Sequence, residues 1–540
     1  MEHSLSGRKE ILSLLKKRVT DLKEGYRQNV ALIGSLYVGK TTILHQLLAE
    51  LDEGALIPVY LDLENRDLDY LASKTARSIL YHFCKNKGLA VSEDLSQLIN
   101  TARPHIPRTV EWVEGIAALI GGGRLEELLD RVLALPNLFS QETDRCTVIV
   151  YDEFQALAEF GVPGIFRKLA DCITTQKRSL CVIASSYEEQ SKKILAEELT
   201  LLFGNFEIVH VLPLDLRASQ EFIERRMGGL RMGLQLRNFL ADFTGGRPLY
   251  LDILIQEVIN LGAIFKQQEV YAPLVVQAME NLIFNRWGAL NRHFELALNR
   301  ITVGKNSQLV TDILFAMANG ARKVKDIIDQ SGGKPAHVAQ RIKYLIDEDI
   351  VEKNGNYFHI KDKLMRYWIK YVFQKRVKSI EMEPGRQRKE FKEEINRAVT
   401  EFQTKCRMDL PSRMMELLNC FDNEQFDLYG RTYKLPVFRG LTPIKMHYRG
   451  GTSFDVIKAD TDDGLWLLIL RKDPLAENDI NAVTDEARKM GLRPRKCVIV
   501  SLASLDDGAR LRALEERMWI WNEPVLNSLM SLYDKPYIVL

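Results

Sequence analysis

Short apolar runs alternate with longer segments of helical spacing between Arg27 and about Leu214. The runs are "NVALIG", "LIPVYLDL", "TVIVYDE", "LCVIASS" and "FEIVHVL". Runs of this kind predict buried strands, and strands that alternate with helices predict a parallel sheet covered by helices. We therefore predict an α/β domain over residues 26–215, with a helical insertion over about residues 75–140.

Helical spacing dominates the middle of the chain. Residues 216–297 predict helices only, broken at "TGGRP". Residues 298–378 predict helices followed by "DIVEKNGNYFHIK", in which the Asn-Gly pair is a strong signal for a hairpin turn. Helices followed by a hairpin are the outline of a winged helix.

The two ends of the chain carry different patterns. Residues 1–25 predict an amphipathic helix. Residues 379–391 are polar and charged and predict a linker. Residues 392–540 predict a separate mixed α/β domain, with strands at "SFDVIKAD", "LWLLILRK" and "KCVIVSL".

Composition narrows the class of protein. A chain of 540 residues with 46% hydrophobic and 27% charged residues is typical of a soluble protein with several domains. A net charge of +2 excludes a global attraction to nucleic acid, so contact with DNA would need a local patch. The seven scattered cysteines form no Cys-x-x-Cys pair, which argues against zinc and indicates a reducing compartment. With neither a signal peptide nor a membrane span in the sequence, we expect a cytoplasmic protein.

The stretch "VALIGSLYVGKTTIL" joins a strand pattern to a helix pattern through a turn bounded by glycines. The spacing Gly-x-x-x-x-Gly-Lys-Thr is that of a P-loop, whose backbone amides curl around phosphate oxygens at a helix N-terminus. In such a loop Lys40 meets the β and γ phosphates and Thr41 holds Mg²⁺. We expect ATP and Mg²⁺ to bind here, at Gly34, Ser35, Leu36, Tyr37, Val38, Gly39, Lys40, Thr41 and Thr42.

A second predicted strand ends in two acids, in "CTVIVYDEFQAL". Asp152 is expected to reach Mg²⁺ through water, and Glu153 to polarise the water that attacks the γ phosphate. With Lys40, these acids favour an ATPase over a passive nucleotide binder. The alternative is that the acids only mark the end of a strand.

A third predicted strand ends in Ser185 and Ser186, in "LCVIASSYEE". A small polar side chain here can contact the γ phosphate or its water, and we assign that catalytic role to Ser185. Serine is also a good helix N-cap, so the two serines can divide the two roles between them.

Taken in order, these motifs resemble the archaeal-type AAA-superfamily P-loop ATPases of the signal-transducing (STAND) group, which are related to archaeal replication initiators. The segments that carry the resemblance are "SGRKEILSLL", "GSLYVGKTT", "VIVYDEFQ", "VIASS", "VHVLPLDLRASQEFI", "TGGRPLYL" and "NYFHIKDKLMRYWIKYV", over roughly residues 6–373. The resemblance implies an AAA-type ATPase core with a helical lid and a winged helix that repack on ATP binding and hydrolysis.

The resemblance also implies roles for residues outside the P-loop. Gly7 and Arg8 match the box near the adenine, with a surface charge as the alternative for Arg8. Pro248 matches a turn placed against the nucleotide, and Arg247 is a candidate phosphate sensor, unless "TGGRP" only separates two helices. Relatives commonly carry an arginine finger where this chain has Asn205, so we expect slow hydrolysis unless Arg167, Lys168 or Arg178 supplies the finger.

The predicted winged helix has two possible roles. Its second helix could enter the major groove of duplex DNA with Lys334, His337, Gln340, Arg341 and Lys343. Acids near the hairpin would weaken the attraction to phosphate, and winged helices also serve as internal lids. The sequence leaves both roles open.

The C-terminal domain resembles a restriction-endonuclease-like fold. A working site would need two acids and a lysine, and Asp455 and Lys472 match two of these positions. Leu470 stands where the middle acid belongs, so cleavage is doubtful unless Glu401 or Asp473 substitutes. We expect a degenerate fold kept for binding or assembly.

Three functions follow from these patterns. The preferred one is an ATPase switch that recognises a protein partner, nucleic acid or a second copy of itself. The alternatives are an ATP-dependent DNA-binding assembly factor and an ATP-gated nuclease.

Overall fold

The computed structural model describes residues 8–51, 54, 56–199, 206–302, 307–378, 384–428, 431–447, 453–503 and 505–538. The chain divides into two compact units. Unit 1 comprises Met1–Arg226, Gly246–Ile253 and Ile346–Asp349, and unit 2 comprises Met227–Gly245, Leu254–Leu345 and Ile350–Leu540. In the described part of the chain, every helix is too short or too polar to cross a membrane.

Unit 1 is built on a five-stranded sheet of order β2-β3-β4-β1-β5. Each pair of neighbouring strands is parallel, which confirms the predicted α/β class. The strands are β1 (Asn29–Ile33), β2 (Leu56–Asp62), β3 (Cys146–Asp152), β4 (Ser179–Ser185) and β5 (Phe206–His210).

Helices pack on both faces of this sheet. Successive side chains of a strand point to opposite faces, so each strand contributes to both cores. In β1, Val30 and Leu32 join a core with α1 and α2, whereas Ala31 and Ile33 join a core with α3 to α7. These helices are α1 (Lys9–Lys23), α2 (Lys40–Ala49), α3 (Leu68–Asn86), α4 (Leu95–Ala102), α5 (Pro107–Leu119), α6 (Leu125–Thr143) and α7 (Ile165–Thr175).

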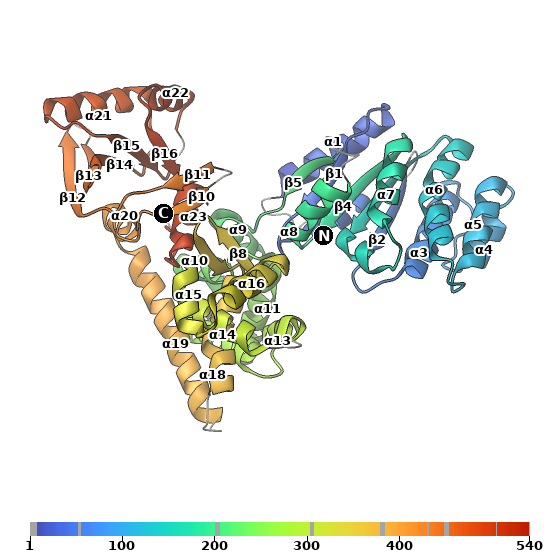
Figure 1. Ribbon diagram of the computed structural model, residues 1–540, viewed down its shortest axis with the longest axis horizontal. Coiled ribbons are helices and arrows are strands. Elements are labelled where there is room, and N and C mark those ends of the chain that lie inside the picture. Colours follow the sequence, from blue (N-terminus) through green and yellow to red (C-terminus); the bar gives the residue numbers. More distant parts are fainter. Residues whose placement is uncertain are drawn as a thin grey trace. The chain divides into compact units, whose positions relative to one another are not determined.

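Helices α3 to α6 lie between β2 and β3 in the chain, where the sequence predicts a helical insertion. In Figure 1, α3, α5 and α6 lie side by side. A 3-10 segment (Phe154–Glu159) follows β3, and α8 (Glu188–Lys193) with a π-helical turn (Ile194–Glu198) follows β4. The carboxyl ends of β1, β3 and β4 thus lead directly into helices or turns, at the sheet edge where α/β proteins bind ligands.

Helices continue after the sheet, interrupted by the short parallel pair β6 (Arg231–Met232) and β7 (Glu269–Val270). Helix α9 (Leu216–Arg226) belongs to unit 1. The helices that follow are α10 (Leu234–Phe243), α11 (Pro248–Ile264), α12 (Ala272–Met279) with a π-helical turn (Glu280–Phe284), and α13 (Ala289–Thr302).

Three helices and a hairpin occupy the segment predicted as a winged helix. They are α14 (Ser307–Ala318), α15 (Val324–Ser331), α16 (Pro335–Asp347), β8 (Val351–Asn354) and β9 (Tyr357–Ile360). The strands β8 and β9 are antiparallel and turn at Gly355. Helix α17 (Lys363–Trp368), a π-helical turn (Ile369–Phe373) and α18 (Gln374–Lys378) follow.

The C-terminal part of unit 2 begins with a long helix, α19 (Pro384–Cys406), so residues 384–391 of the expected linker are helical. After α20 (Leu410–Leu418) come the antiparallel pair β10 (Gln425–Leu428) and β11 (Arg431–Lys434). A five-stranded sheet follows, of order β12-β13-β14-β15-β16. Its elements are β12 (Gly440–His447), β13 (Ser453–Thr461), β14 (Gly464–Arg471), α21 (Glu477–Lys489), β15 (Lys496–Ser501), α22 (Asp507–Glu515), β16 (Trp519–Asn522) and α23 (Glu523–Leu532).

This second sheet is mixed. Strands β12, β13 and β14 are antiparallel neighbours, whereas β14, β15 and β16 are parallel. Its two faces belong to separate cores, one shared with α20 and α23 and the other with α21 and α22. The predicted strands at 453–460, 465–472 and 496–502 correspond to β13, β14 and β15.

Candidate functional site

The loop between β1 and α2 is shaped by its two glycines. A Cβ on Gly34 would lie 2.2 Å from the backbone oxygen of Val211, so only glycine fits there. Gly39 has φ +95°, a conformation that favours glycine, and a Cβ there would meet no described atom within 4 Å. The loop therefore packs closely against the sheet at its start and faces open space at its end, immediately before the N-terminus of α2.

The side chain of Lys40 turns back over this loop. Its Nζ donates to the backbone oxygens of Gly34 at 2.7 Å and Ser35 at 3.1 Å, and to Ser186 Oγ at 2.8 Å. Lys40 is only 4% exposed, so its ammonium group is largely removed from water. A positive charge in such surroundings attracts an anion more strongly than it would in bulk solvent.

Asp152 at the end of β3 faces the first turn of α2. Its Oδ2 accepts hydrogen bonds from Thr41 Oγ1 and from Tyr60 OH, each at 2.8 Å. Burial raises the pKa of the Asp152 carboxyl, although the two hydroxyl donors favour the ionised form. Asp152 thus lies where ionisation of its carboxyl is costly.

We expect Asp152→Asn to preserve or raise the stability of the protein without nucleotide. An elevated folded-state pKa means that ionised Asp152 destabilises the fold at neutral pH, and asparagine removes this cost while still accepting from Thr41 and Tyr60. Thermal unfolding with and without MgATP measures the effect: the midpoint should not fall without ligand, and the shift caused by MgATP should shrink. A variant that unfolds several degrees below the wild type without ligand would contradict this.

Glu153 is held by a small network at the same end of the sheet. Its Oε2 accepts from the backbone N–H of Ser186 and from Gln155 Nε2, each at 2.9 Å. Ser186 Oγ also donates to Glu153 Oε1, and Ser186 Oγ itself accepts from Lys40 Nζ. Glu153 itself has φ +53° and begins the turn after β3. Ser186 therefore connects the lysine of the loop to the acid that follows β3.

The two serines after β4 have separate positions. Ser185 is fully buried, and its Oγ accepts from the backbone N–H of Tyr187 at 3.1 Å, next to the start of α8. Ser186 lines the pocket. The geometry thus gives Ser185 a local capping contact and places Ser186, not Ser185, in the lining of the pocket.

A pocket of about 370 Å³ lies over these groups. Its volume falls within the range of small-molecule sites. The described residues that line it all belong to unit 1: Arg8, Leu36, Tyr37, Val38, Gly39, Lys40, Thr41, Thr42, Ile43, Glu64, Glu153, Ser186, Leu214, Phe222, Arg226, Pro248, Leu249 and Asp252.

Most of the predicted site residues meet in this pocket. Arg8 lines it while donating to the backbone oxygens of Val38 (3.0 Å) and Leu212, so it is a buried residue that holds the loop. Burial lowers the pKa of Arg8, and nearby Asp215 opposes the shift. Pro248, for which the resemblance implies a place against the nucleotide, also lines the pocket.

Other predicted residues lie behind the pocket wall or outside the described chain. Arg247 is buried and donates from Nε to the backbone oxygen of Leu36 at 3.3 Å, so it braces the loop from outside the lining. Gly34, Ser35, Asp152 and Ser185 are likewise absent from the described lining. Gly7 and Asn205 fall outside the described residues.

Several lining residues were not anticipated from the sequence. Arg226 and Asp252 form an ion pair at 3.1 Å, with Phe222 beneath the guanidinium group. Their only signal in the sequence was helical spacing, because Phe222 and Arg226 are one turn apart on α9. Glu64 follows β2, where its place next to the other strand ends depends on the strand order.

Two of the alternative finger residues are engaged within unit 1. Lys168 pairs with Asp130 at 2.9 Å, and Arg178 pairs with Asp144 at 2.7 Å. Recruitment of either one to a nucleotide would first require that ion pair to break.

The C-terminal sheet places Asp455 directly opposite Leu470 on β13 and β14. Opposed residues on antiparallel strands point to the same face, and Leu470 is buried in the core on that face. A leucine side chain offers no oxygen to a metal ion. Among the described residues, no group of three or more His, Cys, Asp or Glu side chains could hold a metal.

Comparison with known proteins gives likenesses of fold. No protein-family model and no curated protein matches the sequence. A solved structure of a Walker-type ATPase of Pyrococcus abyssi is 18% identical, with a TM-score of 0.49, covering 67% of this chain and 95% of that one. The Aeropyrum pernix ORC2 protein is 12% identical, with a TM-score of 0.42, covering 69% and 95%.

The Aeropyrum pernix ORC1 protein, solved in complex with DNA, is 13% identical, with a TM-score of 0.39, covering 67% of this chain and 90% of that one. Because each of these TM-scores lies below 0.5, the function proposed below rests on the geometry of the pocket.

Proposed function

We propose that this protein binds ATP with Mg²⁺ in the unit 1 pocket, hydrolyses it slowly, and uses the nucleotide state as a molecular switch. The observation that carries the proposal is the convergence of Lys40 and Thr41, at the N-terminus of α2, with Asp152 and Glu153, at the end of β3. A loop without side chains at its turning points and a buried ammonium group suit a polyphosphate.

The donor set fits both ligands. Phosphates would lie against the backbone amides of Gly39 to Thr42 and the ammonium of Lys40. Magnesium would be held by Thr41 Oγ1 and Asp152, which already lie within hydrogen-bond distance of each other. When bound, Mg²⁺ neutralises charge on the phosphate oxygens.

Each side chain then has a distinct part in hydrolysis. Lys40 stabilises negative charge at the phosphates. Glu153 orients a water and accepts its proton at a carboxylate oxygen. Tyr60 fixes Asp152 through the 2.8 Å hydrogen bond to Oδ2, and Arg8 and Arg247 hold the loop backbone at Val38 and Leu36.

Ser186 links occupancy of the pocket to the catalytic acid. It accepts from Lys40 and donates to Glu153, so withdrawal of Lys40 toward a phosphate leaves the Ser186 hydroxyl with Glu153 alone. While Ser186 and Gln155 hold Glu153, its carboxylate is less available to a water. Slow turnover is the consequence.

The experiment combines hydrolysis with particle size. Phosphate release from MgATP should be measurable and slow, and should require Mg²⁺. Light scattering with ATP, ADP and a non-hydrolysable analogue then reports the switch: a larger particle with ATP indicates self-association, and a changed shape alone indicates an internal switch. Neither hydrolysis nor any change with nucleotide would contradict the proposal.

A second candidate function is ATP-dependent assembly on duplex DNA. The outward face of α16 favours it, since His337, Gln340 and Lys343 are exposed on this helix while Val338, Ile342 and Leu345 are buried. Lys334, just before the helix, is exposed as well. A mobility shift that weakens steeply with salt and requires ATP would support assembly. An identical mobility shift with and without ATP would show that DNA binding does not depend on the nucleotide switch.

A further inference from the structure

The turn of the β8–β9 hairpin lies against β10 of the C-terminal part of unit 2. Asn354 Nδ2 donates to the backbone oxygen of Asp427 at 3.0 Å, and Asp427 N donates to Asn354 Oδ1 at 2.6 Å. The backbone N–H of Asn356 donates to Gln425 O at 2.9 Å, and that of Gly355 donates to Asp427 Oδ2 at 3.3 Å. Two backbone donors of the turn thus point at oxygens of the C-terminal part.

The contact is closest at Gly355. This residue has φ +59°, and a Cβ there would lie 2.2 Å from Gln425 O and 2.6 Å from Phe426 Cα. Any side chain would push the hairpin away from β10, because both of these atoms belong to backbone. The sequence at the turn is therefore fitted to this contact as well as to the turn itself.

Cations beside the hairpin are neutralised by carboxylates of the same C-terminal part. Lys323 Nζ lies 2.6 Å from Asp422 and 3.2 Å from Glu424. The guanidinium groups of Arg322, at 2.5 Å, and of Arg366 both bind Asp534. Burial opposes ionisation of Asp534, but Arg366 and Arg322 outweigh it and hold the pKa of Asp534 below its usual range.

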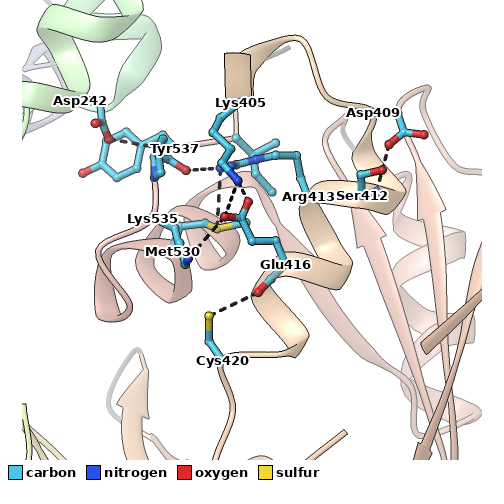
Figure 2. Close-up of polar contacts among 12 residues, drawn as sticks. Asp242, Lys405, Asp409, Ser412, Arg413, Glu416, Cys420, Met530, Lys535 and Tyr537 are labelled. Atoms are coloured by element: carbon cyan, nitrogen blue, oxygen red, sulfur yellow. Dashed lines mark hydrogen bonds and ion pairs between the residues drawn. The ribbon is translucent and has the colours of Figure 1, made fainter. Parts of the chain in front are cut away.

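The segment that carries Asp534 is fixed on both sides. Before it, Tyr533 OH lies 3.2 Å from Tyr357 OH of β9. After it, the chain is anchored by a polar cluster (Figure 2), in which Arg413 donates to Pro536 O, Lys535 binds Glu416 at 3.4 Å and Tyr537 N donates to Asp242 at 3.3 Å. Asp534 is thereby held as a fixed anion between two arginines.

Arginine, lysine and backbone N–H groups are the donors that proteins use to bind nucleic-acid phosphates. Here the three cations and the Gly355 N–H are satisfied by four acidic side chains instead: Asp422, Glu424, Asp427 and Asp534. The Asn356 N–H is satisfied by the backbone oxygen of Gln425. We propose that Arg322, Lys323, Arg366 and the β8–β9 turn form a binding site for the phosphate backbone of duplex DNA, which the C-terminal part of unit 2 covers with its own carboxylates.

This arrangement keeps affinity for DNA low until the C-terminal part moves away. The exposed face of α16 can meet DNA in the covered state, but the phosphate contacts of the hairpin are added only on release. The inference does not depend on the unit 1 pocket, so an experiment can contradict ATP binding without contradicting DNA binding, and the reverse.

The first test compares the full-length wild type with Gly355→Ala and Gly332→Ala. Both glycines have positive φ, but a Cβ on Gly332 meets no described atom within 4 Å, so this control adds backbone strain without the clash. Anisotropy of a fluorescent duplex, measured without nucleotide at several salt concentrations, should show about tenfold tighter binding for Gly355→Ala at ~100 mM salt. Its salt slope should be steeper by about three, one for each uncovered cation. Gly332→Ala should match the wild type.

A second pair of variants removes charge without requiring the hairpin to move. Asp422→Asn with Glu424→Gln uncovers Lys323, whereas Asp462→Asn with Asp463→Asn removes the same charge from exposed pairs with Arg439 and Arg495. The first pair should raise DNA affinity more than the second.

Hydrogen exchange over 422–427 and MgATP affinity show whether Gly355→Ala has released the hairpin while staying folded. An equal gain in DNA affinity from the two double variants would overturn the proposal. If Gly355→Ala releases the hairpin but keeps the DNA affinity and salt slope of the wild type, the proposal is also overturned. The contact would then be only an interface within the protein.

Discussion

Replacing Glu153 by glutamine is expected to reduce ATP hydrolysis by about 10² to 10⁴-fold, the range by which general bases accelerate reactions. Glutamine preserves the size of the side chain and can still accept from Ser186 N and Gln155 Nε2, whose bonds to Glu153 are each 2.9 Å. It cannot take a proton from the attacking water. Single-turnover hydrolysis with bound MgATP measures the chemical step directly.

Binding should survive this change. Because Lys40, Thr41 and the loop amides are untouched, the affinity of Glu153→Gln for MgATP should stay within about threefold of the wild type. Glu159→Gln is the matched control, since Glu159 is exposed in the same turn and does not line the described pocket. Wild-type turnover in Glu153→Gln would remove Glu153 from the catalytic role.

Replacing Gly34 by alanine is expected to destabilise the sheet by about 3 kcal/mol. The new Cβ would lie 2.2 Å from Val211 O, and Val211 cannot withdraw freely because its N–H donates to Ile33 O at 2.8 Å. Hydrogen exchange of β1 and β4 amides should accelerate on the order of a hundredfold. Affinity for MgATP should fall at least about tenfold, because the same movement displaces the loop.

Gly25→Ala provides the control for Gly34→Ala. Gly25 has φ +89°, and a Cβ there would meet no described atom within 4 Å, so alanine introduces backbone strain of about 1 kcal/mol without a clash. Its affinity for MgATP should be that of the wild type. Equal exchange rates in the two variants would show that the contact with Val211 is not what requires glycine at 34.

Local patterns were sufficient to predict the sheet of unit 1. Strands β1 to β4 are short, apolar and mostly buried between two layers of helices, so each appears in the sequence as a continuous run. Strand β5 is less buried, but its sequence is still a short apolar run. The hairpin β8–β9 was equally accessible, since its Asn-Gly turn is a local signal. Strands β10 and β11 were missed because their burial is weak, with Phe426 the one residue of the two strands that is fully buried among those described.

The sequence predicted those site residues that belong to short contiguous motifs. The P-loop and the acids after β3 belong to contiguous motifs, and the parallel sheet brings them together. Ser186 could not be distinguished from Ser185, because the choice depends on which side chain points toward Lys40 rather than toward the backbone of Tyr187. Arg226 and Asp252 could not be found either, because their pairing depends on how α9 and the start of α11 pack.

Equilibrium binding of MgATP to the wild type and to Lys40→Ala tests the central claim most directly. Lys74→Ala serves as the control, because Lys74 is exposed on α3 and its replacement removes the same charge. Loss of a buried ammonium that contacts phosphate should weaken binding by about a hundredfold or more, with Lys74→Ala unchanged. A wild type that does not bind MgATP, or a Lys40→Ala variant that binds it equally well, would contradict the account.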